Sequence, residues 1–154
     1  MSTLFATVRA DDQNLPLFLH VLGAMTLVGG LFTGAAALAF ARRDGRWLRL
    51  GYWSLLAVSL PGWVLMRIGA DWINSEQGWD KLPEDVQPAW LGIGFAAADL
   101  GGLVLAASLV VGGVGVYRLR SGKGSGLLRT TLVLSLVLLA AYLVAVWAMA
   151  GKPD

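Results

Sequence analysis

The chain has 154 residues, a formal net charge of +2, 56% apolar residues and only 14% charged residues. This composition, with the charges gathered into short stretches, is typical of a polytopic membrane protein and leaves no room for a separate soluble domain. The sequence contains no cysteine. Disulfides, thiolate metal sites, iron–sulfur ligation and cysteine nucleophiles are therefore excluded.

Four apolar segments are each long enough to cross a hydrocarbon core of about 30 Å. We predict an all-α, four-transmembrane-helix bundle that forms a single membrane domain over residues 1–154. The expected spans lie at about 15–41, 47–70, 90–117 and 127–150, with a long outer loop at 71–89. Residues 1–14 lack the basic region, short apolar core and cleavage site of a signal peptide, so we expect the first span to remain in the mature protein.

The distribution of charge predicts the orientation of the spans. The loops after the first and third spans are basic, whereas residues 71–89 carry five acids and one lysine. Because basic loops stay in the cytoplasm, we expect both termini and the acidic loop outside, in the plasma (inner) membrane of a bacterium. Tryptophans near both boundaries agree with this assignment.

One carboxylate, Asp99, stands well inside the third span, about 13 Å from Trp90 at 1.5 Å per residue. A charge at this depth costs at least about 2.5 kcal/mol on insertion scales. The candidate partner is Arg67 in the second span, because the Cβ directions of two antiparallel helices let the side chains converge. The alternatives are that Arg67 pairs at i,i+4 with Asp71 or lies on Trp63 near the interface. Without the Arg67–Asp99 pair, we expect Asp99 to be protonated and hydrogen-bonded within the bundle.

The other candidate site residues come from the first and fourth spans. His20, the only histidine, lies about five residues into the first span, and Tyr142 and Trp147 lie near the outer end of the fourth. Together with Arg67 and Asp99, they predict a polar site in the outer half of the bundle. We expect Arg67 and Asp99, and His20 as a further partner, to form the polar floor of a pocket that opens outward below the 71–89 loop.

Several local features predict details of the packing. Rows of small residues at a spacing of four, Thr26, Gly30 and Gly34 in one span and Gly94, Ala98, Gly102 and Ala106 in another, favour close helix contact. Pro61 removes a backbone hydrogen bond and predicts a kink or a local gap. Within residues 74–86, the alternation of apolar and acidic residues predicts a short amphipathic helix across the mouth of the bundle.

Few residues can hold a metal or a cofactor. His20 with Met25, Met66 or Met149 could supply His/Met ligation to haem or soft ligands to Cu(I), and a homodimer could pair two His20 residues. Methionine is also a common filler of apolar cores, so haem and copper stay open alternatives beside simple packing. No zinc pair, catalytic triad or phosphate-binding loop is present, which argues against an enzyme, and no basic surface suits nucleic acid.

Four segments carry a family resemblance: "LHVLGAMTLVGG", "PGWVLMRIGADW", "PAWLGIGFAAADLG" and "VWAMAGKP". Together they resemble small, uncharacterised four-span integral membrane proteins of actinobacteria, loosely similar to copper-resistance-D-like proteins. The resemblance extends over nearly the whole chain and assigns no reaction.

Three classes of function follow. The first is a protein that binds a small ligand, metal or cofactor at the outer-half site. The second is a non-catalytic accessory or assembly subunit of a membrane complex. The third is a small proton-linked transporter that works as a homo-oligomer, because four spans alone rarely enclose a pathway.

Overall fold

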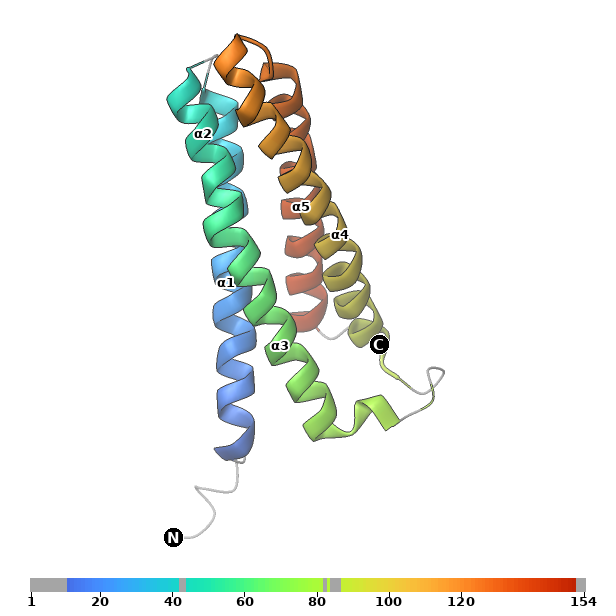
Figure 1. Ribbon diagram of the computed structural model, residues 1–154. Helices are drawn as coiled ribbons and strands as arrows, with labels where there is room; N and C mark the ends of the chain where they lie inside the picture. Colours follow the sequence, from blue (N-terminus) through green and yellow to red (C-terminus); the bar gives the residue numbers. More distant parts are fainter. Residues whose placement is uncertain (1–10, 42–43, 82, 84–86, 152–154) are drawn as a thin grey trace, which may run out of the picture.

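The structure, a computed structural model, describes residues 11–41, 44–81, 83 and 87–151, and its regular elements are helices (Figure 1). The predicted all-α class is confirmed. In chain order the elements are α1 (Asp11–Phe40), α2 (Gly45–Ser54), the π-helical turn η1 (Leu55–Ser59), α3 (Leu60–Gln77), the 3-10 turn η2 (Trp79–Lys81), α4 (Ala89–Arg118), the 3-10 turn η4 (Leu119–Ser121) and α5 (Ser125–Gly151).

Four stretches are long and apolar enough to cross a membrane: Asn14–Phe40, Gly45–Gln77, Ala89–Ser121 and Ser125–Gly151. The predicted four long apolar helices are confirmed, and they are those of a multi-pass membrane protein. The helix of the second span extends about two turns beyond the expected span end at residue 70, because α3 continues through polar residues to Gln77. It stops at Gly78, whose φ of 69° is the left-handed conformation that glycine adopts without strain.

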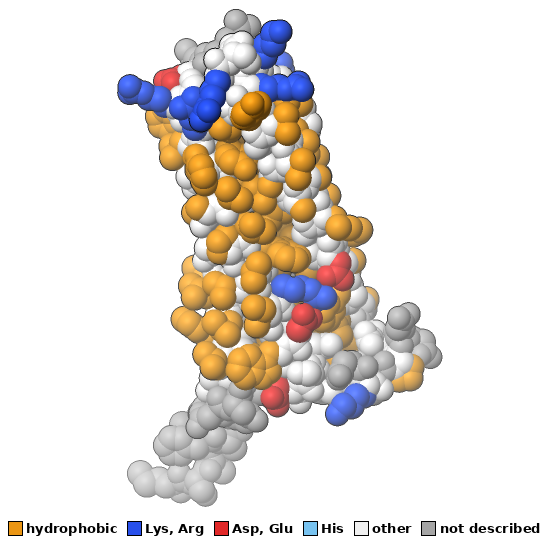
Figure 2. Space-filling model, in the orientation of Figure 1, with side chains coloured by type: hydrophobic (Ala, Val, Ile, Leu, Met, Phe, Trp, Pro, Cys, Tyr) orange, Lys and Arg blue, Asp and Glu red, His pale blue; other side chains and the backbone are white. Residues whose placement is uncertain are grey.

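The helices form two antiparallel hairpins. In one, α1 packs along the continuous rod of α2, η1 and α3, and in the other α4 packs along α5 (Figure 1). The connections at 41–44 and 122–124 lie at one end of the bundle, and the start of α1, the end of α5 and the 78–88 connection lie at the other. Basic side chains gather at the end with the short connections (Figure 2).

Glycines let α1 and the α3 rod pack backbone against backbone. A Cβ added at Gly62 would lie 2.5 Å from the Leu27 nitrogen, and one at Gly69 would lie 2.4 Å from the His20 nitrogen. Gly23 faces Met66 in the same way, at 2.2 Å from its nitrogen. This seam therefore depends on the absence of side chains at these positions.

The seam between α4 and α5 follows a heptad spacing. The buried residues of α4 recur at alternating intervals of three and four residues, and those of α5 do so over most of the helix. Gly94 meets Met149, Gly101 meets Tyr142, and Gly115 meets Leu128, so the register is constant along the seam. Alternation of three and four residues is the packing pattern of left-handed helix pairs.

The expected effect of Pro61 takes the form of the π-helical turn η1, which ends two residues before the proline. The Leu60 N–H bonds to the Leu55 carbonyl, five residues back. A wider turn of this kind accommodates the missing hydrogen bond and the bulk of a proline ring. The turn packs against α1, and directly before it Ser54, the last residue of α2, donates from Oγ to the Gly30 carbonyl at 3.0 Å.

The helix predicted within 74–86 is not present as a separate element in the described part of this segment. Residues 74–77 are the last turn of α3, and Trp79–Lys81 form one 3-10 turn. Residues 82 and 84–86 lie outside the described residues. The physical reason is that α3 outlasts its apolar run and uses the first residues of the segment.

Candidate functional site

A cavity of about 1050 Å³ lies between the two hairpins, toward the end of the bundle that holds the 78–88 connection. All four long helices contribute to its wall. Most of the wall is apolar, and none of the described residues that line it is Asp, Glu, Lys or Arg. Between the hairpins, the backbone of α1 approaches that of α5, whereas the backbones of α3 and α4 come close at few points and are bridged by the side chains of Trp63 and Arg67.

His20 lines this cavity from α1 and is fixed on its other side by α3. Its Nδ1 lies 3.0 Å from the Met66 carbonyl oxygen. Because a carbonyl only accepts, Nδ1 carries the proton in this bond, and in a neutral imidazole Nε2 is then the atom with a free lone pair. A histidine held in this way can accept a hydrogen bond or ligate a metal.

Tyr142 lines the cavity from α5, with only 4% of its surface exposed. Its hydroxyl lies against α4 at Gly101, where an added Cβ would come within 2.3 Å of the oxygen. No hydrogen-bond partner for this hydroxyl lies within the described part of the chain. The residue therefore packs tightly between α5 and α4 and contributes to the cavity wall.

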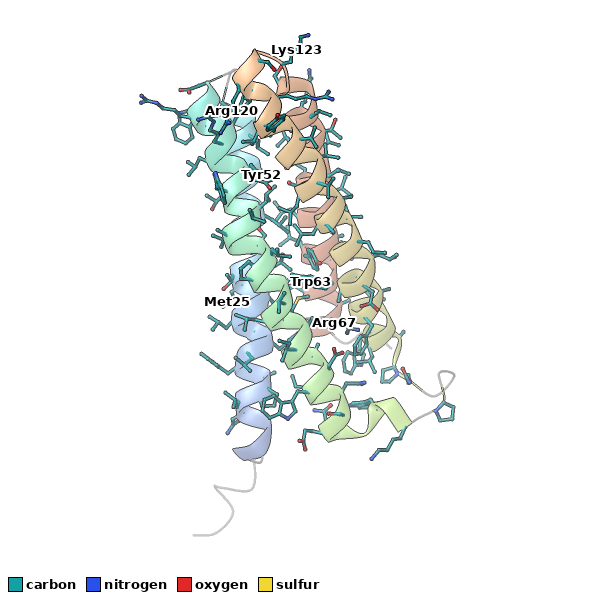
Figure 3. The ribbon with its side chains drawn as sticks, in the orientation of Figure 1. Met25, Tyr52, Trp63, Arg67, Arg120 and Lys123 are labelled. Carbon is teal, nitrogen blue, oxygen red and sulfur yellow. The ribbon has the colours of Figure 1, made fainter. Side chains whose placement is uncertain are left out.

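Arg67 and Asp99 meet, as their helix directions predict. Arg67 Nη2 lies 3.1 Å from Asp99 Oδ1, and Arg67 Nη1 lies 2.8 Å from Asp71 Oδ1. The guanidinium also lies over the Phe95 ring, 5.0 Å from its centroid. The pair with Asp99 and the i,i+4 pair with Asp71 are thus present at once, and the ring under the guanidinium is Phe95 and not Trp63. Figure 3 labels Arg67 and Trp63 on α3.

The structure does not bring this ion pair into the cavity. Neither Arg67 nor Asp99 lines it, and the Asp99 side chain is 58% exposed on the outer face of the bundle. Figure 2 shows positive and negative side chains together on this face. The predicted polar floor made by Arg67 and Asp99 is therefore wrong, and His20, which bonds to the Met66 carbonyl instead, is not a partner of Asp99.

The physical reason lies in the position of Asp99 next to the seam. On α4, Ala98 is buried and Gly102 packs on Trp63 of α3. Asp99 therefore points to the periphery of the bundle, and the Arg67 side chain reaches it along the surface of α3 and α4. In the register of the α4–α5 seam, Trp147 of α5 lies opposite Ala96 of α4. Asp99 is three residues from Ala96, so it lies about 4.5 Å along α4 from the level of Trp147. Asp99 is therefore nearer to a tryptophan level than its distance from Trp90 suggested.

The remaining candidates fall into two groups. Met66 and Met149 line the cavity together with His20, as does Met25, whereas Trp147 is 69% exposed on the outside of α5. No cluster of three or more His, Cys, Asp or Glu side chains suited to a metal ion occurs in the described part of the chain. Haem or copper bound by His20 and a methionine stays a prediction.

Sequence reasoning missed two contacts that shape the site. Trp63 Nε1 donates to the Ala98 carbonyl at 2.9 Å, and its ring occupies the space left by Gly102. At the rim of the cavity, Trp79 packs edge to face on Trp90, with centroids 6.3 Å apart. Seven tryptophans in a chain of this length were a signal, but we assigned six of them to membrane boundaries and considered Trp63 only as a contact of Arg67.

No family model, no curated protein and no solved structure matches this chain. The class of protein is therefore described from the fold and the cavity alone. The chain forms a helical bundle with four candidate membrane spans, and a mostly apolar cavity lies between its two hairpins.

Proposed function

We propose that the protein binds a small apolar or amphipathic molecule of the membrane in the cavity between its hairpins. The size and lining of the cavity carry this proposal. Water fills a cavity where polar groups are present to bond it, and this wall offers few of them around about 1050 Å³. An apolar or amphipathic molecule of the bilayer is therefore the better occupant.

The lining favours a molecule that dissolves in the bilayer over a polar solute. His20 and Tyr142 are the polar side chains of the inner part of the cavity, and Asn74, Gln77 and two indoles lie at the rim. Ligand cavities commonly combine apolar walls with a few placed polar groups. A proton-linked transporter is less well supported, because such a pathway needs polar groups along its length.

The second candidate is an accessory subunit of a membrane complex, and the Arg67–Asp99 pair favours it. Ionisable residues inside a membrane usually face the bundle interior or a partner, whereas this pair lies on the outer face. A partner helix, or a second copy of the chain, would cover the pair. Such a contact is compatible with ligand binding at the cavity.

For the location we propose the plasma membrane of a bacterium, with the basic end in the cytoplasm and the cavity rim and both termini outside. The resemblance to small actinobacterial, loosely copper-resistance-D-like proteins supports this source. Because the chain has no native cysteine, single cysteines can test the orientation. Ser121→Cys should react with a membrane-impermeant maleimide only from the cytoplasmic side and Ser75→Cys only from outside; the reverse pattern would invert the orientation.

A filled cavity can be tested by blocking it. Ala24 lines the cavity from α1, and Ala39 lies exposed on the same helix away from it. Native mass spectrometry of the purified wild type should detect a bound molecule, which Ala24→Phe should lose and Ala39→Phe should keep. A visible spectrum of the same sample reports haem. Wild-type protein without any bound molecule, or an Ala24→Phe variant that keeps it in full, would contradict the proposed function.

A further inference from the structure

We infer that the ligand is an uncharged, chain-shaped lipid that reaches the cavity sideways from the bilayer, between α1 and α5. This inference rests on the proposed function and names the ligand class and its route. The observations that carry it are the position of the opening, the length of the cavity and the lack of charged side chains among its described lining residues.

The opening lies between α1 and α5. The cavity-lining residues with large exposed apolar side chains belong to these two helices: Val21, Met25 and Phe32 on α1, and Leu143 and Val146 on α5. By contrast, the large apolar side chains that α3 and α4 contribute, such as Met66 and Leu91, are buried or half-buried. All five exposed residues lie within predicted spans, so the opening faces lipid rather than water.

The cavity extends along the bundle. Its wall spans about 22 Å on α1, from Leu17 to Phe32, and about 12 Å on α4, from Trp90 to Ala98, at 1.5 Å per residue. The volume of about 1050 Å³ then corresponds to a mean cross-section of about 50–90 Å². With carbon atoms about 4 Å apart at contact, this is room for at least two extended hydrocarbon chains side by side.

The lining of the cavity favours an uncharged headgroup. None of the described lining residues is Asp, Glu, Lys or Arg, so a charged headgroup of either sign would lose hydration and find no ion-pair partner there. Asn74 and Gln77 contribute amides near the rim, where Gln77 Oε1 accepts from Trp79 Nε1. Their amide N–H groups suit an uncharged headgroup such as a hydroxyl or a carbonyl.

The ligand class can be tested with two photoreactive probes that differ in the headgroup alone. A diazirine-bearing dipalmitoylglycerol and the matching phosphatidylglycerol are each mixed with the full-length protein in nanodiscs, irradiated and mapped by peptide mass spectrometry. We expect the diacylglycerol to label cavity residues at least 5-fold more than the phosphatidylglycerol does, and Ala24→Phe to abolish that labelling while Ala39→Phe preserves it. Equal labelling of the cavity by both probes would overturn the ligand class and leave the proposed function standing.

The route can be tested by closing it. Val21→Cys with Val146→Cys places a pair of thiols across the opening, and Ile68→Cys with Ala96→Cys places a matched pair on the outer face of α3 and α4, away from the cavity. Cross-linking the first pair with a short bismaleimide should slow diacylglycerol labelling of the cavity at least 10-fold, whereas cross-linking the control pair should not change it. Unchanged labelling after the first cross-link would refute lateral access. If neither probe labels the cavity and native mass spectrometry finds no bound molecule, the proposed function itself fails.

Discussion

The seam between α1 and α3 gives the sharpest test of the fold, through the substitution Gly62→Ala. The added Cβ would lie 2.5 Å from the Leu27 nitrogen, 2.9 Å from its Cα and 3.0 Å from the Gly23 carbonyl oxygen. All three atoms belong to the backbone of α1, so no side chain can move aside. The two helices must separate by about 1 Å to restore the usual contact distance of about 3.5 Å.

Overpacking of this kind costs about 1–3 kcal/mol, and the rigid neighbours put Gly62→Ala at the upper end. Alanine returns up to about 1 kcal/mol through its helix propensity, so we expect a net loss of about 2 kcal/mol. Gly29→Ala is the matched control, because no atom lies within 4 Å of the added Cβ. Its stability should equal or exceed that of the wild type.

The measurement is the free energy of unfolding in detergent, followed by circular dichroism as a denaturing detergent is added. The thermal midpoint in the same detergent provides a second readout. If Gly62→Ala proves as stable as Gly29→Ala, the two backbones do not approach each other as closely as described, and the reasoning about this seam is refuted.

Three further predictions use the same unfolding assay. Arg67→Leu should cost roughly 2 kcal/mol more than Asp99→Leu, because Arg67 pairs with two carboxylates and its loss leaves both unpaired. The double variant should lose less stability than the two single variants summed. Additive losses would show that Arg67 and Asp99 are not coupled. Trp63→Phe should cost about 1 kcal/mol, because it loses the hydrogen bond to the Ala98 carbonyl of α4. The control Trp53→Phe, at an exposed position, should be close to neutral. Equal losses in both variants would argue against the Trp63–Ala98 bond. His20→Leu should cost about 1 kcal/mol, because its bond joins α1 to α3, and unchanged stability would show that this bond contributes nothing.

Hydropathy predicted the number and type of the elements because each span must be apolar over the thickness of a bilayer. It could not predict the end of α3, because the helix outlasts the apolar run. That end is marked instead by Gly78, in the left-handed conformation. A glycine that follows a polar stretch is a recognisable signal, but the membrane boundary and the helix boundary are different quantities.

Which face of a span points inward was harder to predict, because the lipid-facing and interior faces are both apolar. The spacing of four in Gly94, Ala98, Gly102 and Ala106 tracks the seam for two residues and then drifts, so that Ala106 is exposed. The buried positions alternate between three and four. Heptad spacing would have put Asp99 beside the seam rather than in it, and would have separated the ion pair from the cavity.

The π-helical turn shows how two weak sequence signals combine. Pro61 alone predicted a kink or a gap, and Gly30 alone predicted a close approach by some other helix. The structure joins them: an added Cβ at Gly30 would lie 2.5 Å from Ser59 Oγ and 2.8 Å from the Ser59 nitrogen, so η1 packs directly on the backbone of α1 at this glycine. A wide turn brings more backbone to one side of the rod, and only a helix without a side chain at that level can lie against it. The proline thus sets where the rod widens, and the glycine sets what it packs against.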